Sequence, residues 1–199
     1  MQDYKIQLID FNDSFTQNIR SELHRSGLRC EILNYSLIGH DFDFCKRQVI
    51  ILGPGPGHPD DYQEVTHKLL RQVFARGNIY LMGICLGHQI ILSYLGYEIK
   101  RRKSPKHGQC RVLELPKWRE LEHTGESSRF ISVQEYNSLI VLDHPGSPKI
   151  VHSTFTDNEE ILMSRGENFV TYQFHPESVG TSNSGVFFSF LKKWIDEND

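Results

Sequence analysis

The first half of the chain alternates short apolar runs with helix-like segments, and this alternation limits the folds open to it. Strands are predicted from apolar runs at residues 5–10, 28–33, 48–52 and 79–83. The segments between and after them are predicted to be helices, at residues 18–26, 62–76 and 86–95. An order of strand, helix and strand favours a parallel sheet with helices on both faces. Ligands of such sheets bind beyond the carboxyl ends of the strands.

The second half changes character, because its apolar runs are shorter and are separated by turn residues. Strands are predicted at residues 97–100, 110–115, 130–134, 150–154, 160–164 and 169–174, and a last helix at 186–195. The expected fold class is α/β, with a three-layer, flavodoxin-like, mostly parallel central sheet and a small extra mixed or antiparallel sheet. Since no internal repeat or low-complexity linker interrupts the sequence, residues 1–199 are expected to form a single domain.

Composition and charge exclude several classes of function. The net charge of −3 argues against non-specific nucleic-acid binding. The sequence suggests neither a signal peptide nor a membrane span, because no basic start leads into an apolar run and no apolar stretch is long enough. The four cysteines lie far apart, at positions 30, 45, 85 and 110. This spacing fits neither a zinc site nor a disulfide framework, so we expect a cytoplasmic protein without a metal site.

The segment that joins the strand at 79–83 to the following helix is Gly83-Ile84-Cys85-Leu86-Gly87-His88-Gln89. A Gly-x-Cys-x-Gly at a strand-to-helix corner is the thiol form of the nucleophile elbow, in which small flanking residues permit a tight turn. The N–H groups and the dipole at the start of the helix stabilise a thiolate. We therefore interpret Cys85 as a nucleophile; the alternative is a buried structural cysteine.

A base for this thiol is predicted in the segment Gln173-Phe174-His175-Pro176-Glu177-Ser178. Residues two apart in extended chain point to the same side, so His175 and Glu177 can lie side by side. A carboxylate beside one imidazole nitrogen sets the tautomer, while the other nitrogen faces the thiol. Cys85, His175 and Glu177 would then form a nucleophilic triad. The alternative is a His and a Glu that share a surface loop.

A stiff loop with few side chains follows the strand at 48–52, with the sequence Gly53-Pro54-Gly55-Pro56-Gly57-His58-Pro59. Its backbone N–H groups can point at a ligand. The amides of Gly55 and Leu86 are predicted to form an oxyanion hole. The alternative is a plain turn, since Gly and Pro are common in turns. No Gly-Lys-Ser/Thr follows, so the loop does not resemble a phosphate-binding loop.

Together, these three segments resemble the motifs of the class I (triad) glutamine amidotransferases in identity, order and spacing. Further segments are similar to one subgroup of that family: Asp10, Asp13-Ser14-Phe15-Thr16, Asn18, His107-Gly108 and Tyr136-Asn137-Ser138-Leu139. This subgroup contains the small subunits of chorismate-using synthases. Its members are anthranilate synthase component II and the aminodeoxychorismate synthase counterpart, which belong to tryptophan and folate biosynthesis.

The resemblance implies a role for each site residue. Cys85 would attack the side-chain amide of L-glutamine, His175 would transfer protons, and Glu177 would orient His175. The amides of Gly55 and Leu86 would hold the oxyanion, and water would hydrolyse a γ-glutamyl thioester on Cys85 to glutamate. Glutamine itself would be bound by Gly55, Pro56, Gly57, Gln89, Ser138 and Leu139. Without the resemblance, packing and capping would be the simpler interpretation of Gln89 and Ser138.

The resemblance also implies a partner. Ammonia is mostly protonated in neutral water and must reach a second active site along a dry path. The family pairs this domain with a synthase subunit that binds chorismate and magnesium. We expect that subunit to be a separate chain and expect no cofactor in the present one. The basic run at residues 100–106 belongs either to the interface with that subunit or to a solvated loop.

Some positions depart from the subgroup pattern. The usual Asp-Asn-aromatic-Asp is here Asp10-Phe11-Asn12-Asp13, and a usual Arg-Tyr-His-Ser-Leu is Glu135-Tyr136-Asn137-Ser138-Leu139. Ile91 and Leu92 replace residues that are often small. The triad is untouched, but the partner interface and the product are left open. Three other functions remain: a stand-alone γ-glutamyl thiol hydrolase of the same fold, a non-catalytic regulatory subunit, and a redox sensor that uses Cys85, although no resolving cysteine lies nearby in the sequence.

Overall fold

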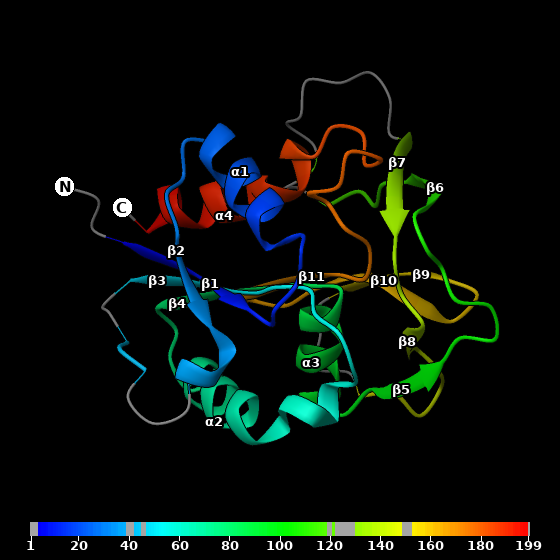
Figure 1. Ribbon diagram of the computed structural model, residues 1–199, viewed down its shortest axis with the longest axis horizontal. Coiled ribbons are helices and arrows are strands. Elements are labelled where there is room, and N and C mark those ends of the chain that lie inside the picture. The colour runs from blue at the N-terminus through cyan, green and yellow to red at the C-terminus, as the bar shows by residue number, and fades with distance from the viewer. Residues whose placement is uncertain are drawn as a thin grey trace.

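A sheet of nine strands lies at the centre of the computed structural model, which describes residues 4–38, 42–44, 47–118, 121, 130–148 and 153–198 (Figure 1). Its parallel part has the order β2-β1-β3-β4-β11. The bounds are Lys5–Asp10 for β1, Glu31–Asn34 for β2, Gln48–Leu52 for β3, Ile79–Ile84 for β4 and Phe169–Tyr172 for β11.

Antiparallel strands extend this sheet beyond β11 in the order β10-β8-β5, and β9 also pairs with β10. Their bounds are Glu160–Arg165 for β10, Leu139–Leu142 for β8, Glu98–Arg101 for β5 and Ser153–Asp157 for β9. A separate antiparallel pair is formed by β6, Gln109–Glu114, and β7, Phe130–Glu135. The predicted class of a mostly parallel central sheet with a small additional antiparallel sheet is confirmed.

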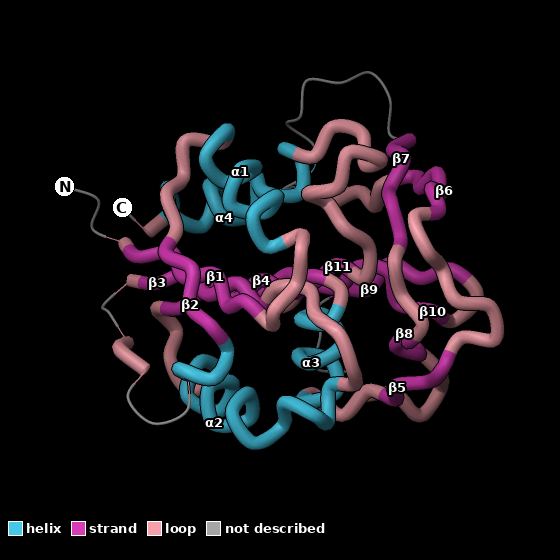
Figure 2. The backbone as a smooth tube through the Cα atoms, in the orientation of Figure 1, coloured by secondary structure: helices cyan, strands magenta, loops and turns pink. Residues whose placement is uncertain are grey.

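Helices cover both faces of the central sheet, which Figure 2 shows between two helical layers. Helices α1, Thr16–Arg25, and α4, Gly185–Glu197, lie on one face (Figure 1). Helices α2, Gln63–Phe74, and α3, Leu86–Tyr94, lie on the other. Among the described residues, short 3-10 helices span Tyr35–Leu37 and Pro59–Tyr62. No helix among the described residues is both long and apolar enough to span a membrane.

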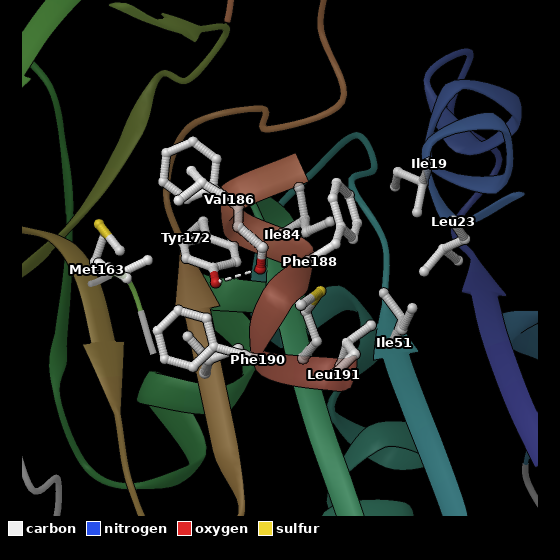
Figure 3. Close-up of a cluster of buried hydrophobic side chains, with 14 of the residues drawn as sticks. Ile19, Leu23, Ile51, Ile84, Met163, Tyr172, Val186, Phe188, Phe190 and Leu191 are labelled. Atoms are coloured by element: carbon white, nitrogen blue, oxygen red, sulfur yellow. Dashed lines mark hydrogen bonds between the residues drawn. The ribbon is translucent and has the colours of Figure 1, made fainter. Parts of the chain in front are cut away.

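The larger part of the core lies between α4, α1 and the sheet (Figure 3). Helix α4 buries Phe187, Phe190, Leu191 and Trp194, which are spaced at three and four residues and so form one apolar face. The hydroxyl of Tyr172 on β11 donates a hydrogen bond to the carbonyl of Phe187 at 2.8 Å. This contact fixes α4 over the strand that leads to the predicted base.

Strands β3 and β4 are buried along their whole length. A parallel strand that is covered by helices on both faces has no solvent side, so its sequence is continuously apolar instead of alternating. Both strands end at the same edge of the sheet, because Leu52 pairs with Gly83. The glycine loop and the Cys85 turn therefore leave the sheet together.

The structure corrects several predicted boundaries. The second strand begins at Glu31 and not at 28, because the N–H of Leu28 closes the end of α1 by bonding Leu23. The last parallel strand ends at Tyr172, two residues early, and β8 was not predicted as a strand. Of the strand predicted at 150–154, residues 150–152 lie outside the described residues.

Most strands of the second half extend the parallel sheet as antiparallel strands. The reason is the short connection between β10, which ends at Arg165, and β11, which begins at Phe169. A connection this short can join only antiparallel neighbours. Strand β10 therefore pairs directly with β11, the last parallel strand.

Candidate active site

The turn between β4 and α3 has the geometry that the sequence predicts for the elbow. Cys85 has φ 53° and ψ −101°, a conformation that residues other than glycine rarely adopt. The flanking glycines are required by space. A Cβ at Gly87 would lie 2.1 Å from the carbonyl oxygen of Leu52, and a Cβ at Gly83 would lie 2.7 Å from that of Gly87. The Cys85 N–H donates to the carbonyl of Tyr172 at 2.8 Å.

The predicted His–Glu pair lies after β11, and both side chains are buried. His175 Nδ1 lies 2.7 Å from Glu177 Oε1. The backbone N–H of His175 donates to Gln134 at 2.9 Å, and the hydroxyl of Thr181 donates to the His175 carbonyl at 2.6 Å. These bonds hold the turn in place, and His175 Nε2 is buried with no hydrogen-bond partner among the residues that the structure describes.

The electrostatics of His175 connect it to Cys85. Burial of the ring pushes the pKa of His175 down, but the charge of Cys85 and then that of Glu177 outweigh this effect. The net result holds the pKa of His175 well above its ordinary value. The protonated ring beside the Glu177 carboxylate is the state that this environment of His175 favours.

Two aromatic rings hold the imidazole, and sequence reasoning assigned them no role. The ring centroids of Phe15 and Tyr136 lie 4.9 Å and 5.2 Å from that of His175, and 5.0 Å from each other. Both residues belong to segments that resemble the subgroup, which is the only sequence signal that pointed to them. The rings of Phe15 and Tyr136 restrict the orientation of the imidazole.

The glycine loop lies over the first turn of α3. The carbonyl of Gly53 accepts the N–H of Gly87 at 3.2 Å. A Cβ at Gly55 would lie 2.6 Å from Leu86 Cδ2 and 2.5 Å from Phe11 Cβ, so this backbone is in close contact with both residues. The N–H of Leu86, the first residue of α3, has no acceptor within the helix. The predicted oxyanion residues, Gly55 and Leu86, are therefore neighbours.

Pro56 and Gly57 follow in the same loop. The carbonyl of Pro56 accepts the hydroxyl of Tyr62 at 2.9 Å. Gly57 has φ +82°, and a Cβ there would lie 2.6 Å from Asp61 Oδ2. The N–H of His58 donates to that same carboxylate oxygen at 2.7 Å. These contacts fix the path of the loop. Glycine is required at position 57 because the φ angle there is positive.

The remaining predicted binding residues lie on α3 and at the start of β8. Gln89 Nε2 donates to the carbonyl of Leu139 at 3.2 Å and to Gln173 Oε1 at 3.1 Å. The carbonyl of Ser138 accepts the N–H of Arg102 at 2.8 Å. The structure therefore connects α3 to residues 138–139. Since both amide hydrogens of Gln89 are used within the protein, a direct contact with a ligand would come from its Oε1.

The departures from the subgroup pattern have structural explanations. Phe11 is fully buried against Gly55, while Asn12 has φ 63°, which asparagine tolerates better than a phenylalanine would. Glu135 is buried and pairs with two arginines, Arg102 and Arg111. Asn137 Nδ2 donates to the carbonyl of Leu139 at 2.9 Å, so it supports the same segment as Gln89.

Two further features belong to this region. A cavity of about 390 Å³ lies between α1 and residues 177–184. Its wall includes Glu177 but neither Cys85 nor His175, so it lies beside the proposed chemistry and not at it. Among the described residues, no group of three or more His, Cys, Asp or Glu is arranged to hold a metal ion.

Comparison with known proteins places this site in a class. The family described as glutamine amidotransferase class-I matches residues 7–194. The chain therefore belongs to the class-I glutamine amidotransferases. The fold agrees: a "putative gmp synthase subunit a protein" from Thermoplasma acidophilum superposes with a TM-score of 0.79 at 19% identity, over 98% of this chain and 96% of that one.

Three individual relatives show which members of this class the chain is similar to. The chain is 30% identical over 190 residues to "Anthranilate synthase component 2" of Saccharolobus solfataricus, which covers 94% of this chain and 97% of the relative. It is 28% identical over 181 residues, 89% of this chain, to "Anthranilate synthase, phenazine specific" of Pseudomonas chlororaphis. It is 33% identical over 197 residues, 94% of this chain, to "Putative aminodeoxychorismate synthase" of Schizosaccharomyces pombe. The chain spans 27% and 26% of the lengths of these last two proteins.

Proposed function

We propose that this chain hydrolyses L-glutamine to glutamate and delivers the ammonia to a separate chorismate-binding synthase subunit. The observation that carries the proposal is the juxtaposition of a strained Cys85 with a buried His175–Glu177 pair, whose contact measures 2.7 Å. Membership of the amidotransferase class supports glutamine as the substrate. The relative of similar length, named an anthranilate synthase component 2, supports anthranilate synthase as the complex, with aminodeoxychorismate synthase next.

In this proposal, the Cys85 thiolate attacks the side-chain amide carbon of glutamine. The N–H groups of Gly55 and Leu86 stabilise the oxyanion of the tetrahedral intermediate. The protonated His175 gives its proton to the leaving nitrogen, which departs as ammonia and leaves a γ-glutamyl thioester on the sulfur. His175 then takes a proton from water, the hydroxide attacks the thioester, and glutamate and the thiolate are released. Glu177 keeps Nδ1 of His175 occupied, so that Nε2 serves both proton transfers.

The binding of the rest of the glutamine is assigned to the surrounding loops. Gly55, Pro56 and Gly57 would contact it from one side and Ser138 and Leu139 from the other. Gln89 already bonds Leu139, so its contribution includes holding that segment in place.

The partner is proposed on chemical grounds. Ammonia must reach the synthase without being protonated by bulk water, which requires a closed path between two docked proteins. The partner and not this chain would hold magnesium. Within the basic run at 100–106, Lys100, Arg101 and Lys103 are exposed and available to a partner, whereas Arg102 turns inward toward Glu135 and Glu160. We place the reaction in the cytoplasm, where reducing conditions keep Cys85 free.

The test is reconstitution. The purified chain would be mixed with the chorismate-binding subunit of an anthranilate synthase and, separately, of an aminodeoxychorismate synthase, with chorismate, Mg²⁺ and glutamine. We expect Cys85→Ser to lower glutamine-dependent synthesis by about 10³-fold or more, while synthesis from added ammonium stays within about twofold of wild type. A parallel fall of both rates would contradict the division of labour between the subunits.

Two controls separate the other functions. Steady hydrolysis of γ-glutamyl peptides without any partner would favour the stand-alone hydrolase. Failure of a glutamine-mimicking electrophile, such as diazo-oxo-norleucine, to form an adduct on Cys85 would favour a non-catalytic subunit.

A further inference from the structure

We propose that Gln173 donates a hydrogen bond to the reacting sulfur of Cys85. Its Nε2 lies 4.0 Å from Cys85 Sγ. The side chain is fully buried, and it belongs to the segment that also provides His175 and Glu177. The inference rests on the proposed role of Cys85 as a thiolate nucleophile and adds a donor to it.

The direction of this contact is fixed by a chain of hydrogen bonds that begins at the backbone. The carbonyl of Leu139 can only accept, so Gln89 must turn its NH₂ group toward it. The same NH₂ group reaches Gln173, which must therefore present its oxygen, Oε1, at 3.1 Å. The NH₂ group of Gln173 is then the end that faces Cys85. No other orientation of the two amides satisfies all the partners.

The sheet explains why these residues meet. Strands β4 and β11 are parallel neighbours in which Ile84 pairs with Tyr172. The next residues along the two strands, Cys85 and Gln173, therefore leave the sheet side by side. Gln173 also precedes His175 by two residues, so the segment after β11 brings both residues to Cys85.

Burial makes such a donor effective. Gln173 is 0% exposed and Gln89 is 3% exposed, so water does not compete for the contact. A hydrogen bond to a charged acceptor is worth more than one between neutral groups, and it favours the ionised form of the acceptor. Gln173 would thus stabilise the thiolate by donating a hydrogen bond. It would take no part in proton transfer, because an amide does not give up its proton. Through Gln89 it also connects the sulfur to Leu139, in the segment proposed to bind glutamine.

The experiment measures alkylation of Cys85 by iodoacetamide from pH 5 to pH 10 in the full chain. The Cys85 peptide is followed by mass spectrometry, because Cys110 is exposed and also reacts. In Gln173→Met, which has a similar shape but no N–H, we expect the midpoint of the alkylation profile to move up by about one pH unit. The rate on the alkaline plateau should stay within about twofold, since access to the sulfur is unchanged.

Gln48→Met is the matched control. Gln48 is also fully buried, but it starts β3, at the end of the strand remote from Leu52 and the elbow. It should keep the wild-type midpoint. His175, whose pKa is coupled to Cys85, and its partner Glu177 are present in every variant. Burial lowers the pKa of His88, on the same helix, to about 3, so it stays uncharged throughout the pH range.

An unchanged midpoint in Gln173→Met, or an equal shift in Gln48→Met, would overturn the inference. If Gln173→Met does not fold, Gln173→Glu replaces it: this side chain still accepts from Gln89 but places a negative charge near the sulfur, so the midpoint should rise at least as far. A wild-type profile there would likewise overturn the role of Gln173. Failure of the proposed function looks different, because wild-type Cys85 would then bind no glutamine-mimicking electrophile.

Discussion

The backbone of Cys85, with φ 53° and ψ −101°, holds a conformation that costs on the order of 1–3 kcal/mol for a residue with a side chain. Its neighbours keep it there, since its N–H bonds Tyr172 and its carbonyl accepts the N–H of Gln89. In this position the sulfur lies near an imidazole whose other nitrogen is occupied by Glu177. At the scale of residues, the strained backbone of Cys85 and the buried His175–Glu177 pair thus act on the same atom, the sulfur of Cys85.

The titration of His175 provides a test at this scale. The pKa of His175 is raised well above its ordinary value, and Cys85 is the largest cause that raises it. The ring should therefore remain protonated through neutral pH in the wild type and lose its proton only well above pH 6.5. In Cys85→Ser the charge of the sulfur is gone while burial still opposes protonation, so the pKa of His175 should fall.

The measurement is NMR of the imidazole ring of His175 in both proteins across the pH range. Cys110→Ser changes an exposed cysteine that is not among the groups that shift the pKa of His175, so it is the control and should leave the titration unchanged. A His175 titration that is the same in Cys85→Ser and wild type would contradict the electrostatic coupling.

At the scale of elements, β4, the Cys85 turn and α3 form one unit whose packing depends on two glycines. Helix α3 lies so close to β3 that its first turn touches the backbone of Leu52. This close packing brings the N-terminus of α3 directly beneath the glycine loop, where the N–H of Gly87 bonds the carbonyl of Gly53. Because this unit depends on Gly83 and Gly87, the short Gly-x-Cys-x-Gly motif is enough to predict its shape.

Gly87→Ala should therefore destabilise the protein. The added Cβ would lie 2.1 Å from the carbonyl oxygen of Leu52, and that oxygen belongs to backbone that cannot move aside cheaply. We expect a loss of about 3 kcal/mol or more in the free energy of unfolding, measured in urea. Gly77→Ala is the control, since nothing lies within 4 Å of its added Cβ. Equal midpoints for the two variants would refute the close-packing account.

At the scale of the whole molecule, charges connect the small β6–β7 sheet to the central one. Glu135 at the end of β7 pairs with Arg111 at 3.0 Å and with Arg102 at 3.5 Å. Both arginines also reach Glu160 on β10. Burial raises the pKa of Glu160, against the opposing effect of these arginines. Because Glu135 precedes Tyr136, this network also fixes the start of the segment that contacts His175.

Glu135→Gln tests that network. It removes the most buried negative charge of that network, which is 1% exposed, and leaves two arginines with fewer partners. We expect a cost of about 3 kcal/mol in the free energy of unfolding. Glu31→Gln removes the partner of Lys5 in an ion pair whose side chains are 35% and 50% exposed, and should cost less than about 1 kcal/mol. Comparable urea midpoints for the two variants would show that the network is not stabilising.

Sequence reasoning succeeded where a structural requirement is local. The Gly-x-Cys-x-Gly pattern predicted the turn at Cys85, because only small neighbours fit beside that backbone. The two-residue period predicted that His175 and Glu177 would lie side by side. The sequence did not predict that the rings of Phe15 and Tyr136 contact His175, because both residues come from distant loops and no periodicity marks them.

The sequence by itself therefore determined which residues have the chemistry, the backbone shape at Cys85 and the alternation that makes a parallel sheet. The tertiary structure alone decided that β8, β10 and β5 extend that sheet, and that Glu135 faces two arginines. It also decided that Gln173 emerges beside Cys85. The physical reason is that this meeting depends on the register between β4 and β11, with Ile84 opposite Tyr172. Strand pairing joins segments far apart in the chain, and the pattern of either segment alone does not specify it.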